Sequence, residues 1–389
     1  MTIPTNTLPV ADRSASRVIN QKAIIDMIYS TDEISKAQLA KELSISKPAV
    51  SSNVADLISI GLVEEIGEGE ATKSGGRKPM MLRFNENYSY IGALDVSLQE
   101  PVCAVSDLKY NLVGTRKIHI EATASAEDKR QCVLDTFTRI LAPMHLSPGD
   151  LGIIVISQPG IIKEETNEYF SNERHHIWTE IGLKEYLQNE LDIPVLVRND
   201  VNMAAMGELH FGLEDRVSDL FYVSCGVGLG AGIVINGKLH EGLNGAAGEI
   251  GALQTNDGRR SENVIAIGGL IEKVASILDD FGGHEEINFQ YIVKQAKANN
   301  SIVNTVIFET GVALGRTIHN CCAVLDIPTV VFGGEYLELG QALFDGMDKA
   351  LERTSVIHPK VRPSLLRQTA GIYGCFVIGK EKIIEGLIR

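Results

Sequence analysis

The first 60 residues of the chain space their apolar side chains as three amphipathic helices would. Residues 17–29 form the first predicted helix, and residues 36–43 form the second, with Ser35 as its cap. The third covers residues 47–60, with Ser46 as N-cap and Pro48 in the first turn, where a missing N–H does no harm. The residues predicted to face the core are Val18, Ile24, Ile25, Ile28, Leu39, Ala40, Leu43, Val50, Val54, Leu57 and Ile58.

Small and polar residues are predicted on the outer face of the third helix, where it begins. Such residues let a helix enter the major groove of DNA, because bulk would hold it away from the base edges. Two predicted strands, 62–66 and 80–84, follow, and the glycine-rich stretch between them ends in a basic segment, which suggests a β-wing. The order predicts a winged helix-turn-helix that binds DNA; the alternative is a three-helix protein-interaction domain. The candidate DNA-binding residues are Ser46, Lys47, Ala49, Ser51, Ser52, Asn53, Arg77 and Lys78.

From about residue 90 the pattern changes to short apolar strands followed by helices. This pattern of strands followed by helices occurs twice, which predicts a duplicated α/β architecture with a cleft between two lobes. The predicted strands are 91–96, 102–106, 112–118, 151–157, 194–198, 220–225, 230–235 and 329–332, and the helices of the first half are 132–141 and 178–191.

Charge divides the chain unevenly. The net charge is −14, yet residues 1–83 hold ten basic and ten acidic side chains, so the later residues carry all of it. A neutral head on an acidic body is expected if only the head approaches phosphates. No apolar run approaches the roughly 18 residues that a membrane span needs, and the N-terminus has no export signal. The six cysteines include no Cys-x-x-Cys pair, which fits a reducing cytoplasm.

Four motifs in the body resemble those of one protein family. Residues 225–232 (CGVGLGAG) resemble the second phosphate loop of actin-like sugar kinases, and residues 244–251 (NGAAGEIG) are similar to a glycine-rich segment of the ROK family (repressors, open reading frames, kinases). Residues 198–202 (RNDVN) resemble its sugar and base motif, and residues 333–334 its late glycine pair. Together with the head, the resemblance is to NagC/XylR/Mlc-type repressors. It implies a two-lobed actin-like (ribonuclease H-like, sugar kinase) fold behind the winged head.

The resemblance also implies effector-binding residues. Asn199 and Asp200 follow a buried strand, where an amide and a carboxylate can bind sugar hydroxyls, and in the kinases the matching Asp takes the proton of the attacking hydroxyl. The alternative for Asn199-Asp200 is an Asx-type helix cap. The glycines around Glu249 would present its carboxylate to paired hydroxyls. Glu262 takes the place of the acidic residue that ends the family's sugar motif.

Two departures from the family pattern argue against catalysis and against zinc. The first phosphate loop of the kinases reads D-x-G-G-T or D-x-G-x-T, but here it is Asp95-Val96-Ser97-Leu98-Gln99. Both glycines and the threonine are absent, and Leu98 places an apolar branch where phosphate oxygens would need donors. We therefore expect no catalytic residues and poor binding of ATP. Where the family has a histidine and a cysteine cluster, this chain has Ala252 and residues 253–269, without cysteine, so no metal site and no cofactor are predicted. His175 and His176 are the remaining candidates to contact an altered ligand, although a solvated loop pair is the simpler interpretation.

The sequence thus predicts three units: a winged helix-turn-helix (1–84), an actin-like N-lobe (85–198, completed by 372–389) and a C-lobe (199–371) with the oligomerisation surface and the effector cleft. The predicted function is a cytoplasmic, sugar-responsive, kinase-inactive transcriptional regulator, a repressor of carbohydrate metabolism genes. Its predicted partners are a double-stranded DNA operator, a sugar or sugar-derivative effector, and further copies of the chain in a homodimer or dimer of dimers. Alternatives are an active ROK sugar kinase with a fused DNA-binding head and a ligand-independent DNA-binding protein.

Overall fold

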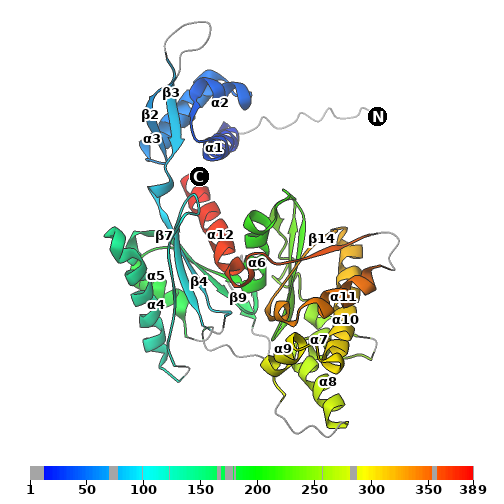
Figure 1. Ribbon diagram of the computed structural model, residues 1–389. Coiled ribbons are helices and arrows are strands. Elements are labelled where there is room, and N and C mark those ends of the chain that lie inside the picture. The colour runs from blue at the N-terminus through cyan, green and yellow to red at the C-terminus, as the bar shows by residue number, and fades with distance from the viewer. Residues whose placement is uncertain are drawn as a thin grey trace, which may run out of the picture.

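Three helices and a small sheet form the N-terminal head of the protein. The computed structural model describes residues 13–69, 78–98, 100–121, 123–163, 168–170, 178, 181–255, 257–280, 287–352 and 357–388. The head projects from one end of a larger body that holds two further sheets (Figure 1). Its helices are α1 (Arg13–Ser30), α2 (Lys36–Glu42) and α3 (Lys47–Ser59).

Local capping explains where α2 and α3 begin. The Ser35 side chain accepts a hydrogen bond from the Gln38 backbone N–H, and the Gln38 side chain accepts one from the Ser35 N–H at 2.9 Å, which completes a capping box. Ser46 accepts from the Ala49 N–H at 3.4 Å, and Pro48 stands in the first turn of α3. The predicted starts of both helices are therefore confirmed.

The apolar faces of the three helices meet in one core. Ile24, Ile28, Leu39 and Val50 are fully buried there. The prediction for Val18 is wrong: its side chain is 37% exposed, whereas Ile24, Ile25 and Ile28 further along α1 are buried. Ala40, Leu43 and Ile58 are partly buried against the same core.

The wing is a three-stranded sheet in the order β1-β3-β2. Strands β2 (Val63–Glu68) and β3 (Met80–Phe84) pair antiparallel, with a register shift between Glu65 and Gly67. The short strand β1 (Ile34–Ser35), which the hydrophobic pattern did not reveal, pairs with β3. The predicted basic tip, Lys73 to Arg77, lies outside the described residues.

The first body sheet has five strands in the order β10-β7-β4-β5-β6. Alternate side chains of these strands face opposite sides, as the two-residue period of a strand requires. Helices α4 (Ala126–Leu141) and α5 (Leu183–Leu191) cover one side, and α12 (Ala370–Leu387) packs against the other (Figure 1). The strands are β4 (Tyr90–Asp95), β5 (Val102–Asp107), β6 (Leu112–Lys117), β7 (Leu151–Gln158) and β10 (Val195–Asn199).

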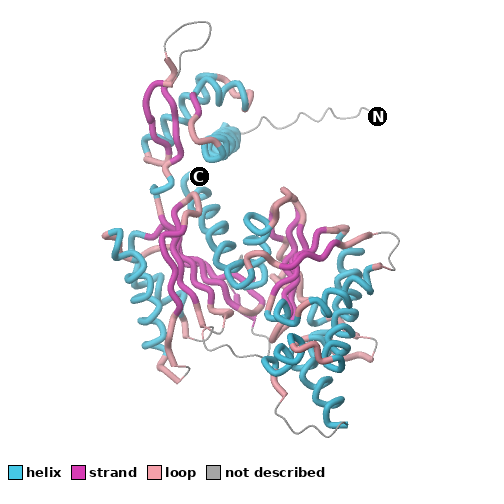
Figure 2. The backbone as a smooth tube through the Cα atoms, viewed as in Figure 1, coloured by secondary structure: helices cyan, strands magenta, loops and turns pink. Residues whose placement is uncertain are grey.

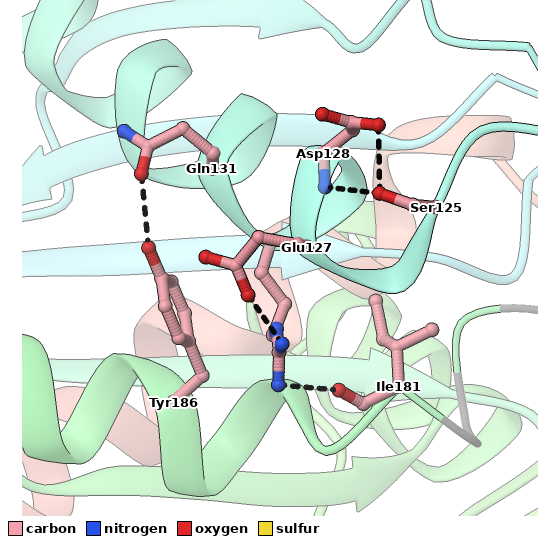
Figure 3. Close-up of polar contacts among 7 residues, drawn as sticks. Ser125, Glu127, Asp128, Gln131, Ile181 and Tyr186 are labelled. Carbon is pink, nitrogen blue, oxygen red and sulfur yellow. Dashed lines mark hydrogen bonds and ion pairs between the residues drawn. The ribbon is translucent and has the colours of Figure 1, made fainter.

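Polar contacts join α4 to α5 on the outer side of this sheet. The Tyr186 hydroxyl donates to Gln131 Oε1 at 3.0 Å, and the Arg130 guanidinium donates to the Ile181 carbonyl (Figure 3). Ser125 caps α4 by accepting from the Asp128 N–H at 3.1 Å. The sequence placed the start of α5 at residue 178, but Trp178 lies buried in a turn and the helix begins at Leu183.

The second body sheet repeats the connectivity of the first. Its order is β13-β12-β11-β14-β15. In both sheets three strands form an antiparallel meander. A fourth strand pairs in parallel with the first strand of the meander, and a fifth pairs in parallel with the fourth. The duplicated α/β architecture predicted from the sequence is therefore confirmed (Figure 2). The strands are β11 (Leu220–Cys225), β12 (Leu229–Ile235), β13 (Lys238–Leu239), β14 (Thr329–Gly333) and β15 (Lys360–Pro363).

Helices fill the rest of the body. α12 and α6 (Asp200–Gly207) lie between the two sheets, and one apolar core runs from the head through α12 to strands of both sheets (Figure 1). Two short antiparallel strands, β8 (Ile161–Lys163) and β9 (Glu168–Phe170), follow β7. The far side of the second sheet is covered by α7 (Ser261–Ile265), α8 (Ile267–Asp280), α9 (Phe289–Lys297), α10 (Ser301–Leu325) and α11 (Gln341–Leu351).

The predicted unit boundaries at 84, 198 and 371 remain predictions. Strand β3 ends at Phe84, β10 ends at Asn199, and α12 starts at Ala370, two residues before the predicted C-terminal segment. Among the helices that the structure describes, none has both the length and the apolar character that a membrane span needs.

Candidate functional site

The start of α3 presents an exposed polar surface. Ser46, Lys47, Ser51 and Ser52 are exposed there, and Ala49 is half-buried. Ser46 has a second task as the N-cap of the helix. These five side chains are small apart from Lys47, so this end of the helix can approach a groove closely.

Asn53 does not belong to this exposed surface, and its predicted orientation is wrong. Its side chain is 5% exposed, and its Nδ2 donates to the Ala49 carbonyl at 2.7 Å within the same helix. The Oδ1 atom is buried without a hydrogen-bond partner among the described residues. Residue 53 falls at the edge of the apolar stripe, three positions after Val50, and the helix turns it inward.

The wing contributes one described candidate. Lys78 is exposed just ahead of β3, whereas Arg77 lies outside the described residues. Three other basic residues of the head form ion pairs within it: Arg17 with Asp56 at 2.8 Å, Lys36 with Glu65 at 3.1 Å and Arg83 with Glu64 at 3.1 Å.

A second group of polar residues gathers where β10 passes into α6. Asn199 is the N-cap of α6: its Oδ1 accepts from the Asn202 N–H at 2.9 Å. Its Nδ2 donates to the Gly160 carbonyl at 3.0 Å. The Asx-type cap considered from the sequence is thus present, and it fixes the Asn199 amide beside the first residue of the helix, Asp200.

Asp200 is the centre of a group of carboxylates. Burial raises the pKa of Asp200 to about 7, and the nearby carboxylates of Asp95 and Glu249 add to that rise. Asp95 ends β4 and is itself 2% exposed. Sequence reasoning treated Asp95 only as the start of a degenerate phosphate loop; its position in the family motif was the signal that could have placed it beside Asp200.

The loop at residues 244–249 carries Glu249 to the same place. Gly245 has a φ of +73°, and a Cβ there would lie 2.8 Å from the carbonyl carbon of Ile162 in β8. Only glycine suits both the backbone conformation and this close approach. Burial raises the pKa of Glu249, and the neighbouring Glu262 carboxylate raises it further.

Glu262 stands in the first turn of α7, and its Oε2 accepts from the Leu229 N–H at 3.4 Å. The structure therefore brings Asp95, Asp200, Glu249 and Glu262 together, with Asn199 beside Asp200. We call these five residues the acidic site. Carboxylates and an amide accept and donate hydrogen bonds in the pattern that sugar hydroxyls require.

A short hairpin occupies the region where the family pattern has its cysteine cluster, which this sequence lacks. Gln254 and Arg260 form an antiparallel bridge, and the Thr255 N–H donates to the Arg259 carbonyl at 2.8 Å. Arg259 pairs with Asp257 at 2.7 Å across the turn. Within the described part of the chain, no three His, Cys, Asp or Glu side chains are grouped as metal ligands. His175 and His176 lie outside that part.

In both loops that correspond to the phosphate loops of the kinases, a carboxylate of the protein lies against the backbone. Asp95 accepts from the Ser97 N–H at 2.9 Å and from the Ser97 hydroxyl at 2.6 Å, so the turn after β4 closes on its own aspartate. At the second loop, the Glu335 carboxylate lies directly against Gly226, where an added Cβ would collide with it. Glu335, which follows the late glycine pair, was not predicted as part of this region.

Comparisons with known proteins identify the fold and the family. A family model described as "ROK family" matches residues 91–382, and one described as "Winged helix-turn-helix DNA-binding" matches residues 19–64. The chain belongs to the ROK family, with a winged helix-turn-helix head on a sugar-kinase-like body of the actin type.

Individual relatives agree with this assignment. A xylose repressor of Bacillus spizizenii is 32% identical over 63% of this chain; the match spans 62% of that relative, less than two thirds of its length. A crystal structure of a ROK family transcriptional regulator, described as a homologue of the E. coli MLC protein, has a TM-score of 0.78 at 22% identity and covers 96% of this chain and 98% of its own. The ROK hexokinase of Thermus thermophilus has a TM-score of 0.63 at 18% identity and covers 76% of this chain and 100% of its own.

Proposed function

We propose that the protein is a sugar-responsive, DNA-binding transcriptional regulator that represses genes of carbohydrate metabolism. One observation carries this proposal: the exposed polar start of α3, in a winged helix-turn-helix head, is joined to a ROK body that retains the acidic site. The head supplies a surface for DNA, and the body supplies a site for a polyhydroxylated ligand.

The DNA-binding part of the proposal assigns α3 to the major groove. Ser46, Lys47, Ala49, Ser51 and Ser52 would contact bases and phosphates, and Lys78 with Arg77 would contact the backbone beside the wing. One short recognition helix gives limited specificity, so the protein would bind an inverted repeat as a homodimer or a dimer of dimers.

The ligand part of the proposal assigns a sugar to the acidic site. Its hydroxyl groups would be bound by Asn199, Asp200, Glu249 and Glu262. Asp95 would act through Asp200, whose pKa it raises. Because a relative is named a xylose repressor, D-xylose is the first sugar to test. The desolvated carboxylates support this assignment, since such groups are costly to bury without a partner.

We further propose that the body does not transfer phosphate and that the protein needs neither ATP nor a metal. A phosphate cradle needs backbone N–H donors free of negative charge. In this chain Ser97 and Leu98 replace the two glycines of the first loop, and the Ser97 N–H is already bonded to Asp95; the Glu335 carboxylate against Gly226 would repel phosphate oxygens at the second loop. The pKa of Asp200, about 7, is suited to a general base that takes a proton from a sugar hydroxyl. This observation favours the alternative of an active kinase, which an assay of ATP turnover tests.

The experiment begins with the full chain and random-sequence duplex DNA. Rounds of selection should recover a duplex with two inverted half-sites. Lys47→Ala should then weaken binding, while Lys349→Ala on α11, an exposed lysine far from the head, should not. If protein lacking residues 1–84 binds the same duplex, the head is not the DNA-binding unit.

A sugar panel containing D-xylose and D-glucose tests the ligand part. Thermal stability should rise with one of these sugars in the wild type and much less in Glu249→Ala, because the sugar hydroxyls lose the carboxylate that accepts their hydrogen bonds. ATP turnover measured with the same sugars separates the two functions. Sugar-dependent turnover would show that the protein is a kinase, and a flat profile for all sugars would support the ligand-independent alternative.

A further inference from the structure

A row of aromatic rings joins the head to the body. The Tyr29 ring of α1 lies 6.4 Å from that of Tyr110, measured between centroids, and Tyr110 lies 5.2 Å from Phe211. Phe211 in turn lies 5.0 Å from Tyr373 of α12. These separations are those of rings in contact. The four rings come from four different elements, so the head, the first sheet and both central helices meet in one place.

Lys380 of α12 lies within this row. Its Nζ is 3.6 Å from the centroid of the Tyr29 ring and 4.7 Å from that of Tyr110, within the range of cation–π contacts. Desolvation lowers the pKa of Lys380 to about 8, while the carboxylates of Asp26 and Glu381 oppose that change. We call Tyr29, Tyr110, Phe211, Tyr373 and Lys380 the junction cluster.

A rigid turn holds Tyr110 in position. Asp107 Oδ1 accepts from the Lys109 N–H at 2.8 Å and from the Asn111 N–H at 2.9 Å, and its Oδ2 accepts from the Asn111 side chain at 2.8 Å. Tyr110 has a φ of +66° at this turn between β5 and β6. The backbone that carries the Tyr110 ring is therefore held by the first sheet, so a movement of the head relative to the body changes the contact between Tyr29 and Tyr110.

Two helices connect the junction cluster to the acidic site. α6 starts at Asp200 and continues directly into a π-helix, Glu208–Gly212, that carries Phe211. At about 1.5 Å per residue, roughly 16 Å of helix separates Asp200 from Phe211. The second connection is α12, whose first turn holds both Gly371, which packs against the Asp95 carboxylate, and Tyr373; Lys380 lies about two turns further along the helix.

The π-helix is also tied to α12. Glu208 is fully buried, and its Oε1 accepts hydrogen bonds from the Ser364 hydroxyl and from the Leu366 N–H, the latter at 3.0 Å. Ser364 and Leu366 lie just ahead of a short 3-10 helix, Arg367–Thr369, that leads into α12. A π-helix is rare and often marks a functional site, because the backbone there departs from the regular ladder. A shift of α6 would thus displace Phe211 and the start of α12 together.

We propose that the junction cluster transmits the state of the acidic site to the DNA-binding head. The proposal rests on the proposed function, since it assumes a ligand at the acidic site. A sugar that contacts Asp200, and through it changes the interaction of Asp200 with Asp95, moves the adjoining ends of α6 and α12. The parts of α12 and of the π-helix in the junction cluster then reposition Tyr110 and Lys380 against Tyr29. The sugar shifts the equilibrium only because it binds two arrangements of this junction unequally. These five residues are positioning residues that contact neither DNA nor sugar.

The test compares full-length variants on the selected duplex, with D-xylose and D-glucose as probes. Phe211→Ala removes a ring that is 36% exposed, and Lys380→Met removes the cation but keeps the stem, so neither empties a core. Tyr186→Ala is the matched control, because its ring also stacks on a cation, with Arg130 5.1 Å from its centroid, but lies on α5.

The wild type and Tyr186→Ala should change DNA affinity with the active sugar by at least about fivefold, the lower end of ordinary allosteric coupling. In Phe211→Ala and Lys380→Met that ratio should fall to within about twofold of one, while DNA affinity without sugar and sugar affinity measured by calorimetry are retained.

The outcomes separate the two hypotheses. If Phe211→Ala and Lys380→Met respond to sugar as fully as the wild type, the junction cluster does not transmit the signal, and the proposed function stands. If neither sugar changes the DNA affinity of the wild type, the proposed sugar response fails, and this inference fails with it. Loss of sugar binding itself in Phe211→Ala would also overturn the inference, because the ring would then belong to the ligand site.

Discussion

Asp200 should destabilise the folded protein at neutral pH, and its replacement should reveal this cost. Its pKa is raised from 3.8 to about 7, so between these values the folded carboxyl holds a proton that the unfolded chain has released. Stability must then fall as pH rises through this window, since the unfolded chain binds fewer protons. Asp200→Asn removes this titration and should stabilise the protein above pH 7.

The size of the effect follows from the shift. About three pKa units correspond to about 4 kcal/mol as an upper bound. Part of the shift comes from the charge repulsion between Asp200 and Asp95, and asparagine at position 200 can still accept hydrogen bonds from the backbone at the start of α6. We therefore expect about half of that bound, or about 2 kcal/mol. For a body of this size the melting temperature should rise by about 3 °C at pH 8.

Thermal melts of the wild type and Asp200→Asn from pH 4 to pH 8 provide the assay. The difference in melting temperature should be small near pH 4, grow through the window and level off above pH 7. Asp150→Asn is the control of opposite sign, because hydrogen bonds from Ser147 lower the pKa of that exposed carboxyl. A difference that does not vary with pH, or a lower melting temperature for Asp200→Asn at pH 8, would refute the reasoning.

Three further predictions concern the head, the ligand loop and metal. Ser35→Ala breaks the capping box of α2 and should cost about 1 kcal/mol of head stability, measured by chemical denaturation of the full chain followed through DNA binding; an unchanged midpoint would count against it. Gly245→Ala forces a Cβ toward the Ile162 carbonyl at a φ of +73°, so calorimetry should show weaker sugar binding with DNA affinity retained; equal sugar affinity would refute it. Chelators should leave the melting temperature unchanged, and elemental analysis that finds one zinc per chain would contradict this.

The head could be predicted from local signals, with one exception. Ser35, Ser46 and Pro48 define the helix starts through interactions within four residues, which a sequence displays directly. Asn53 shows the limit of this approach. Its polar side chain suggested an outward position, but helix geometry places it beside the apolar stripe, where it bonds to its own backbone.

The acidic site could be predicted only in part, because its members come from distant segments. Asn199, Asp200, Glu249 and Glu262 were found through motifs, and the structure brings them together. Asp95 and Glu335 gain their importance only from three-dimensional packing, beside Asp200 and against Gly226 respectively.

The junction cluster gave no sequence signal at all. Its rings are single aromatic residues scattered from position 29 to position 373, and each looks like an ordinary core or surface residue in its own segment. Only the packing of the head on α12 and on the turn between β5 and β6 gathers them. Contacts between units therefore escape pattern-based prediction, because no local period encodes them.

The most direct test of the central claim is the affinity of the full chain for its selected duplex, measured with and without D-xylose or D-glucose, in the wild type and in Asp200→Ala. We predict that one sugar changes the affinity of the wild type and that Asp200→Ala binds the duplex but responds much less, since the ligand loses a buried partner. An identical sugar response in both proteins would contradict the account, because the sugar would then act at a different site.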